Sequence, residues 1–271
     1  MTVLLHLSDT HFGTEQEAVV VAARKLAHAE QPDAVILSGD ITQRARAAQF
    51  DAARIFCDGL QVERLLTLPG NHDIPLYNVA ARLFAPYAGY ARVFGRNLEP
   101  ELEFADVLVI GVNTTRPERH KDGEVSPQQI ERVARRLQGA RRDQLRVVVT
   151  HQPVCVMRPE DEKDRLHGAD AAVQAWSQAG ADLVLGGHIH LPYVSDACAR
   201  VKGTGRTMYC VQAGTALSLR VRHNTPNSLN VIRWTAPAAG APRICKVERW
   251  DYDLADDRFE MTHPYDLTLG D

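Results

Sequence analysis

Three short apolar segments in the first 73 residues each run straight into a polar loop. The segments are VLLHLSD (residues 3–9), DAVILSGD (residues 33–40) and VERLLTLPGNHD (residues 62–73). Apolar runs of this length are typical of strands that are buried on both faces, as in parallel or mixed sheets covered by helices. The carboxyl ends of parallel strands meet at one edge of a sheet, so we expect the three polar loops to lie together.

The stretches between these segments carry the spacing of amphipathic helices. Val19, Ala22, Ala23 and Leu26 follow the i, i+3, i+4, i+7 pattern of a buried helix face, and residues 47–60 show a weaker version of it. The first 73 residues therefore predict the order strand, helix, strand, helix, strand.

The middle of the chain continues this alternation. Strands are predicted at residues 106–113, 145–151 and 182–190, and a helix at residues 170–179. Another helix is predicted to begin after Ser126, because Ser126 suits the N-cap, Pro127 suits the first helical position and Gln129 completes a capping box.

Beyond residue 190 the pattern changes to short strands separated by Gly, Pro and Asn turns. The predicted strands are residues 191–196, 206–213, 228–234 and a final run with Trp250, Tyr252 and Leu254. This pattern is typical of antiparallel sheet. We expect one α/β domain over residues 1–271, with a motif-bearing βαβ part in residues 1–190 and a mainly antiparallel β part in residues 191–271.

Five polar motifs follow predicted strand ends. They are Asp9-x-His11, Gly39-Asp40, Gly70-Asn71-His72-Asp73, Thr150-His151 and Gly187-His188-Ile189-His190. Carboxylate, imidazole and amide groups around two cations are what a hydrolytic dimetal site needs. Residues two apart on an extended segment point the same way, so each D-x-H or H-x-H pair can serve one site. Burying these groups unpaired would cost on the order of several kcal/mol, which favours a shared metal centre over five unrelated turns.

These motifs resemble those of the calcineurin-like metallophosphoesterases, in which D-x-H, G-D, G-N-H-[DE], H and G-H-x-H occur in this order. Within that family, HLSDTH, SGDIT and LPGNHD are most similar to the bacterial cyclic-nucleotide phosphodiesterase and glycerophosphodiesterase branch. Residues 214–232 (GTALSLRVRHNTPNSLNVI) are also similar to that branch. The resemblance implies two mixed β-sheets packed as a sandwich, with helices on the outside.

The resemblance also implies a role for each motif residue. One metal would be bound by Asp9, His11 and His190, the other by Asn71, His151 and His188, and Asp40 would bridge both. A hydroxide that bridges the metals would be the nucleophile. His72 would lie beside the scissile phosphate and give the leaving group a proton or a positive neighbour, with Asp73 orienting it.

The donor set restricts the metals. Mixed oxygen and nitrogen ligands without thiolate suit Mn²⁺, Fe, Co²⁺ or Zn²⁺ better than Mg²⁺ or Ca²⁺, and the resemblance favours Mn²⁺ and Fe. None of the five cysteines falls in a motif, so we expect reduced, mostly buried thiols.

Two polar segments are candidates for the substrate cleft. Asn113, Arg116 and His120 lie on a loop that leaves a predicted strand end. A basic segment that contains Arg220, Arg222 and His223 could reach the site or a partner copy, and the sequence leaves this open.

Composition and charge restrict the classes of partner that we expect the chain to bind. A formal net charge of −3 gives no general attraction to nucleic acid, and the arginine-rich stretch at residues 132–146 is interpreted as a solvated helix face. No apolar run reaches the roughly 20 residues that cross a bilayer, and the first residues lack the basic flank of a signal peptide. We expect a cytoplasmic protein with a small-molecule substrate, and a homo-oligomer is left open.

The favoured function is hydrolysis of small phosphodiesters such as cyclic nucleotides or glycerophosphodiesters. This choice rests on the resemblance and on the absence of a recognisable basic pocket for a dianion. A phosphomonoesterase, or a pyrophosphatase acting on a nucleotide-linked lipid precursor such as a nucleotide-sugar lipid, is the first alternative. A non-catalytic scaffold that keeps only the fold is the second, and the complete ligand set disfavours it.

Overall fold

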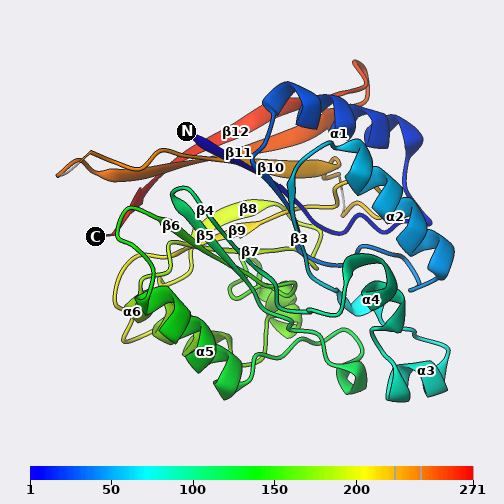
Figure 1. The fold of residues 1–271 in the computed structure, drawn as a ribbon, viewed down its shortest axis with the longest axis horizontal. Coiled ribbons are helices and arrows are strands. Elements are labelled where there is room, and N and C mark those ends of the chain that lie inside the picture. The colour runs from blue at the N-terminus through cyan, green and yellow to red at the C-terminus, as the bar shows by residue number, and fades with distance from the viewer. Residues whose placement is uncertain (223, 239, 271) are drawn as a thin grey trace.

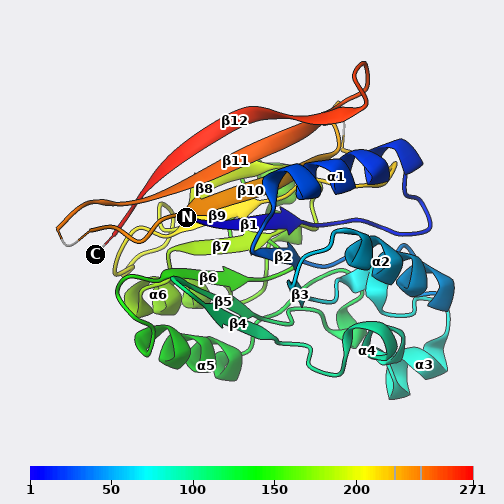
Figure 2. The same cartoon turned by 45° about the horizontal axis from the view of Figure 1, so that its top comes forward.

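Two six-stranded sheets pack against each other, with helices on both outer sides (Figures 1 and 2). The computed structural model describes residues 1–222, 224–238 and 240–270, so His223 of the basic segment lies outside the described residues. The arrangement is the sandwich of two mixed sheets that the sequence predicted.

The first sheet has the strand order β12-β11-β10-β1-β2-β3. The strands are β1 (Thr2–Leu7), β2 (Ala34–Leu37), β3 (Arg64–Thr67), β10 (Ser228–Trp234), β11 (Arg243–Asp253) and β12 (Arg258–Leu269). β1, β2 and β3 run parallel, whereas β10, β11 and β12 are antiparallel to their neighbours. Helices α1 (Glu17–Glu30) and α2 (Ala47–Gly59) connect the parallel strands, so the predicted βαβαβ order is confirmed.

The second sheet has the strand order β4-β5-β6-β7-β9-β8. The strands are β4 (Glu101–Phe104), β5 (Val107–Gly111), β6 (Leu145–Val149), β7 (Leu183–Gly186), β8 (Tyr193–Asp196) and β9 (Tyr209–Gln212). Although β9 lies beyond residue 190, it runs parallel to β7, so the expected antiparallel pattern fails at this strand. The chain first forms β8 at the outer edge of the sheet and then turns back. β9 therefore lies between β8 and β7, antiparallel to β8 and parallel to β7.

Helices α5 (Pro127–Gln138) and α6 (Ala169–Ala179) cover the outer face of the second sheet (Figure 2). The capping box at the start of α5 is confirmed, since Ser126 Oγ accepts from Gln129 N at 3.2 Å and Gln129 Oε1 accepts from Ser126 N at 2.9 Å. Local sequence patterns did not predict β4, β12 or two short helices, α3 (Val79–Phe84) and α4 (Ala88–Phe94). β12 was not predicted because half of its side chains are polar and most of them are exposed.

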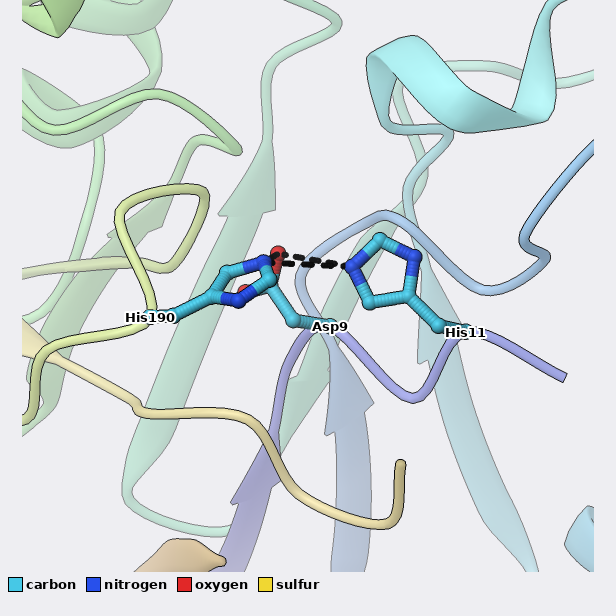
Figure 3. A group of neighbouring side chains, drawn as sticks. All are labelled: Asp9, His11 and His190. Atoms are coloured by element: carbon cyan, nitrogen blue, oxygen red, sulfur yellow. Dashed lines mark hydrogen bonds and ion pairs between the residues drawn. The ribbon is translucent and has the colours of Figure 1, made fainter. Parts of the chain in front are cut away.

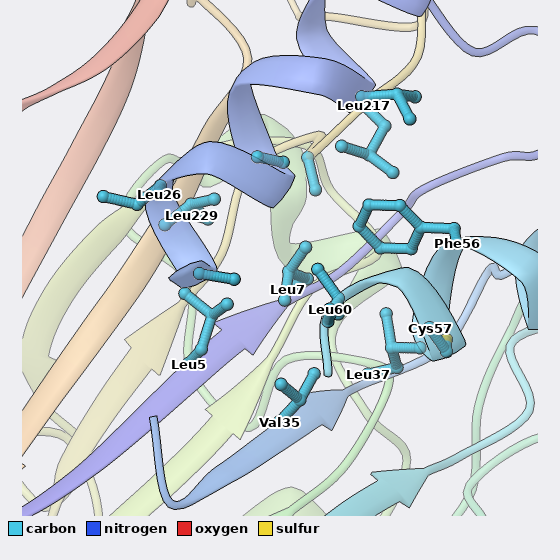
Figure 4. Close-up of a cluster of buried hydrophobic side chains, with 14 of the residues drawn as sticks. Leu5, Leu7, Leu26, Val35, Leu37, Phe56, Cys57, Leu60, Leu217 and Leu229 are labelled. Carbon is cyan, nitrogen blue, oxygen red and sulfur yellow. The ribbon is translucent and has the colours of Figure 1, made fainter. Parts of the chain in front are cut away.

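Alternation along β1 builds two different cores. Leu4 packs between the two sheets, whereas Leu5 and Leu7 pack outward against the helices. Figure 4 shows Leu5 and Leu7 with Leu26 of α1 and Phe56 of α2. Because both faces of the sheet are buried, the strand is apolar nearly throughout, as its sequence predicted.

The parallel strands deliver their polar loops to one end of the sandwich. The loops that follow β1 and β7 come together there, as Figure 3 shows for the residues that they carry. Among the described residues, none of the helices combines the length and the apolar character that crossing a membrane requires.

Candidate metal centre

The first group of candidate ligands is Asp9, His11 and His190, whose ligand atoms lie within 4.8 Å of one another. Asp9 and His11 come from the loop after β1, and His190 faces them from the loop after β7 (Figure 3). His190 Nε2 lies 3.2 Å from His11 Nε2 and 3.3 Å from Asp9 Oδ1. Two imidazoles and a carboxylate therefore converge on one point.

The second group is Asp40, His151 and His188. Asn71 adjoins this group, because its Oδ1 lies 3.3 Å from His151 Nε2. Asp40 lies between the groups: its Oδ1 is 3.3 Å from His151 Nε2, and its Oδ2 is 3.8 Å from His11 Nε2. One carboxylate thus presents an oxygen to each group, which is the geometry that a bridging ligand needs.

His188 and His190 belong to different groups, as the resemblance to the family implied, and not to one site, which the spacing of an H-x-H pair alone would allow. β7 ends at Gly186, and His188 and His190 have φ values of 71° and 57°. Asp9 and His11 also have positive φ, at 52° and 44°. Such left-handed residues do not alternate like a strand, and they cost on the order of 1–3 kcal/mol each, a strain that is typical of functional sites.

The close approach of these loops requires glycine at two positions. Gly39 has a φ of 112°, and a side chain there would overlap the ring of His151. A Cβ at Gly187 would overlap the side chains of Ser8 and Asp9. The glycines of the motifs therefore serve packing as well as turn formation.

Backbone carbonyls orient two of the imidazoles. His151 Nδ1 donates to the carbonyl of Ser38 at 2.9 Å, and His190 Nδ1 donates to the carbonyl of Arg220. Each ring therefore turns its Nε2 toward the carboxylates. Histidines that bind metals are commonly held by such a bond on the other ring nitrogen.

Of the other two candidate ligand imidazoles, His11 is buried and His188 is half-buried. Burial lowers the pKa of His11 to about 3, and burial with repulsion from His151 lowers the pKa of His188 to about 4. Within the described part of the chain, Nδ1 of both rings and Oδ1 of Asp9 have no hydrogen-bond partner. Imidazoles whose pKa is lowered in this way, and a buried carboxylate oxygen without a hydrogen-bond partner, are groups that a cation would satisfy. The residues present therefore fit a pair of divalent metal ions.

An imidazole–carboxylate pair lies in each group. Burial opposes charge on His151, but the carboxylate of Asp40 outweighs it and raises the pKa of His151 to about 9. In the first group, Asp9 in the same way raises the pKa of His190 against the effect of burial. A metal binds neutral imidazole, so metal binding would release these protons.

His72 lies beside the first group, with its ring centroid 4.9 Å from that of His11. Its Nδ1 lies 3.0 Å from the carbonyl of Gln43, and its Nε2 lies 3.0 Å from Nη1 of Arg220. A carbonyl only accepts and a guanidinium only donates, so the proton is on Nδ1 and Nε2 carries the lone pair. The sequence analysis assigned no role to Gln43 and left Arg220 open, because nothing in their local sequence shows where they reach.

Asp73 ties the loop after β2 to the loop after β3. Its carboxylate accepts from the N–H groups of Ile41, Thr42 and Gly70 at 3.0, 2.7 and 2.8 Å. Burial and the repulsion of a neighbouring carboxylate raise the pKa of Asp73 to about 6. Among the described residues, no hydrogen bond joins Asp73 to the ring of His72. Asp73 can therefore orient His72 only by fixing the backbone of the loop that carries it.

Two cavities open on the ligand groups and meet at Asn71, His72 and Lys121. The larger has a volume of about 510 Å³ and is lined mainly by charged side chains. The smaller has a volume of about 250 Å³, and its lining includes Ile74 and Leu76.

The larger cavity is lined by four carboxylates, those of Asp40, Glu160, Asp161 and Asp164, and by as many cations. Lys121, Lys163, Arg220 and Arg222 line it, and they come from three separate segments. Arg222 donates two hydrogen bonds to Asp161, at 2.8 and 2.9 Å. Lys121 forms an ion pair with Asp164 at 2.7 Å. The formal charges of the lining therefore balance, and Lys163 and Arg220 are the two of its cations without a carboxylate partner among the described residues.

Of the three candidate substrate residues, one lines one of these two cavities and the other two do not. His120 lines the smaller cavity. Asn113 Oδ1 accepts from Thr115, and Arg116 donates to Gln129 Oε1 at 2.7 Å, so both side chains hold their own loop together. Neither is among the residues that line the two cavities, and a substrate role for them stays a prediction.

A model of the calcineurin-like phosphoesterase family matches residues 2–192, which is more than half of the chain. The chain belongs to the calcineurin-like phosphoesterase family. Its members use a dinuclear metal centre, and the two ligand groups described above are candidates for holding one here. Family and site together support a metal-dependent phosphoric ester hydrolase.

Known relatives of this calcineurin-like phosphoesterase include diesterases and phosphatases. Over 81 residues it is 35% identical to the glycerophosphodiester phosphodiesterase GpdQ of Enterobacter lignolyticus (strain SCF1), a match that covers 26% of this chain and 29% of that protein. The chain thus spans less than a third of the length of that curated relative.

Two solved structures share the fold. Purple acid phosphatase PPD1 from yellow lupin (Lupinus luteus) seeds has a TM-score of 0.71 at 12% identity, covering 98% of this chain and 53% of that one. A dimetal phosphatase from Danio rerio has a TM-score of 0.67 at 12% identity, covering 99% of both chains. At these identities the likeness establishes the fold alone.

Proposed function

We propose that this calcineurin-like phosphoesterase hydrolyses small phosphodiesters with two divalent transition-metal ions, first of all Mn²⁺ or Fe, with Co²⁺ or Zn²⁺ as further choices. In this proposal Asp9, His11 and His190 hold one metal, Asn71, His151 and His188 the other, and Asp40 both. When bound, the cations would neutralise the charge of the phosphate and lower the pKa of a bound water. The position of Asp40, with one oxygen toward each group, is the observation that carries the proposal.

His72 is proposed to contact the phosphate or its leaving group, and Asp73 to hold the loop that carries it. In the structure Nε2 of His72 accepts a bond from Arg220. The proton-donating role expected of His72 therefore requires that Arg220 first release the ring and that Nε2 gain a proton. A positive charge on His72 requires the same protonation of Nε2, whereas the guanidinium of Arg220 already places a positive charge beside the ring.

The two cavities support a diester as substrate. A phosphodiester carries two organic substituents on one phosphate, and the cavities extend on two sides of Asn71 and His72. Their volumes of about 510 and 250 Å³ give each substituent a place. The partial identity to a glycerophosphodiester phosphodiesterase supports the same choice. A single domain over residues 1–271 and a cytoplasmic location stay predictions.

A phosphomonoesterase or pyrophosphatase is the second candidate, and an arginine of the larger cavity favours it. A terminal phosphate carries an extra negative charge, which Arg220 could attract, because its guanidinium has no carboxylate partner among the described residues. A non-catalytic scaffold is disfavoured by the complete ligand set.

Two substrates with the same leaving group test the choice. Protein reloaded with Mn²⁺ after chelation should hydrolyse bis(p-nitrophenyl) phosphate with a higher kcat/KM than p-nitrophenyl phosphate. A ratio that favours the monoester by more than about tenfold, or about 1.4 kcal/mol, would select the second candidate. Reloaded protein that binds metal but hydrolyses neither substrate would reject both.

A further inference from the structure

Arg220 contacts the candidate site through its main chain as well as its side chain. Its carbonyl accepts from Nδ1 of His190 and from Thr215 Oγ1, the latter at 2.8 Å. Its N–H donates to Ser218 Oγ at 3.3 Å. These bonds hold the backbone of Arg220 against His190, a candidate metal ligand, and so fix the point from which the side chain of Arg220 extends.

The guanidinium of Arg220 contacts an imidazole and an amide oxygen, not a carboxylate. Nη1 lies 3.0 Å from His72 Nε2 and 3.2 Å from Gln43 Oε1. Of its side-chain nitrogens, only Nη1 takes part in hydrogen bonds within the described residues. By contrast, Arg222 and Lys121 on the same cavity wall are each paired with a carboxylate.

A guanidinium has five N–H donors, so most of those on Arg220 are available to a ligand in the cavity. No carboxylate partner neutralises its charge in the described part of the chain. A cation in this state gains most from an anionic oxygen, because charge-assisted hydrogen bonds are about twice as strong as neutral ones.

We propose that Arg220 determines how strongly the site binds dianionic phosphates, by placing its guanidinium on a phosphate oxygen. A phosphomonoester has three non-bridging oxygens, and two metal ions leave at least one of them in need of a partner. In a diester, an esterified oxygen without charge takes the place of one of these oxygens. Arg220 is thus a specificity-determining residue that favours phosphomonoesters, which are also the products of a diesterase.

This inference rests on the proposed function, but a binding titration tests it without turnover. Protein reloaded with Mn²⁺ is titrated calorimetrically at pH 8 with inorganic phosphate, a dianion, and with dimethyl phosphate, a monoanion. The test variant is Arg220→Gln, which removes the charge and retains an amide that can donate to His72. Its carbonyl still holds His190, so metal content, measured in parallel, should match the wild type.

Arg220→Gln is expected to lower the affinity for inorganic phosphate by at least about tenfold and that for dimethyl phosphate by less than about threefold. Lys163→Gln is the matched control, because it removes one positive charge from the same cavity without touching His72. If Arg220→Gln does not fold, Arg220→Met replaces it, with the same expectation.

Equal losses for the two anions in the Arg220 variant would overturn the inference, since a residue that only positions His72 does not distinguish them. The same selective loss in Lys163→Gln would also overturn it, by pointing to the general charge of the cavity. A wild type that binds phosphate but hydrolyses neither p-nitrophenyl substrate would reject the proposed function and leave the result for Arg220 readable.

Discussion

Replacing Asp40 by asparagine removes one negative charge from between the two ligand groups and preserves the shape of the side chain. Asp40 is 2% exposed, and its two oxygens face His151 and His11, which belong to different groups. Under the proposed function, the substitution would therefore weaken the binding of both metals. Asn71→Ala is the natural comparison, because Asn71 Oδ1 approaches only the second group.

The expected magnitudes follow from this geometry. Removing a residue that only supports a metal ligand costs about 10- to 100-fold in metal affinity. Asp40 is proposed to be a direct and charged ligand, so Asp40→Asn should cost more than about 100-fold at each metal, or about 2.7 kcal/mol. Asn71→Ala removes one neutral ligand and should weaken one metal by less.

Metal content at a fixed free Mn²⁺ concentration, measured by mass spectrometry after chelation and dialysis, provides the assay. The wild type should approach two ions per chain, Asn71→Ala should lie between one and two, and Asp40→Asn should fall below one and lose activity. His72→Ala is the control and should keep two ions. A wild type that never exceeds one ion per chain would refute the dinuclear proposal, and an Asp40→Asn protein with two ions at unchanged affinity would refute the bridging role.

Three further variants test other parts of the argument. His72→Ala should lower turnover about 10²- to 10⁴-fold on a diester with a poor leaving group; an equal loss with a p-nitrophenyl diester, whose leaving group needs no proton, would exclude proton donation. Asp182 is fully buried and holds the guanidinium groups of Arg146 and Arg243, so Asp182→Ala should lower the free energy of unfolding in urea by about 3–5 kcal/mol. A loss below about 1 kcal/mol would show that these charges find other partners. Ser126→Ala removes the N-cap of α5 and should cost about 1 kcal/mol in the same assay, whereas Ser126→Asp should retain most of the stability.

The sequence alone predicted what local patterns encode. The apolar strands, the helix stripes and the cap at Ser126 depend on residues that are neighbours in the chain, so their periodicity shows them. The five motifs were recognisable for a related reason: each ligand lies next to a strand end, and parallel strands bring their ends to one edge. The polar strand β12 and the short helices α3 and α4 were missed because their local patterns are weak.

The resemblance to the family implied how the recognised residues are shared between two metals, but only the tertiary structure shows how their backbones reach this arrangement and what surrounds them. His188 and His190 separate because packed loops hold their backbones at positive φ, a state that no periodicity predicts. The contact of Arg220 with His72 joins residues 148 positions apart. The four cations of the larger cavity likewise come from three distant segments of the chain. Ligand types are a local property of the sequence, but the charge that meets a substrate is a sum over residues that only the folded chain brings within reach.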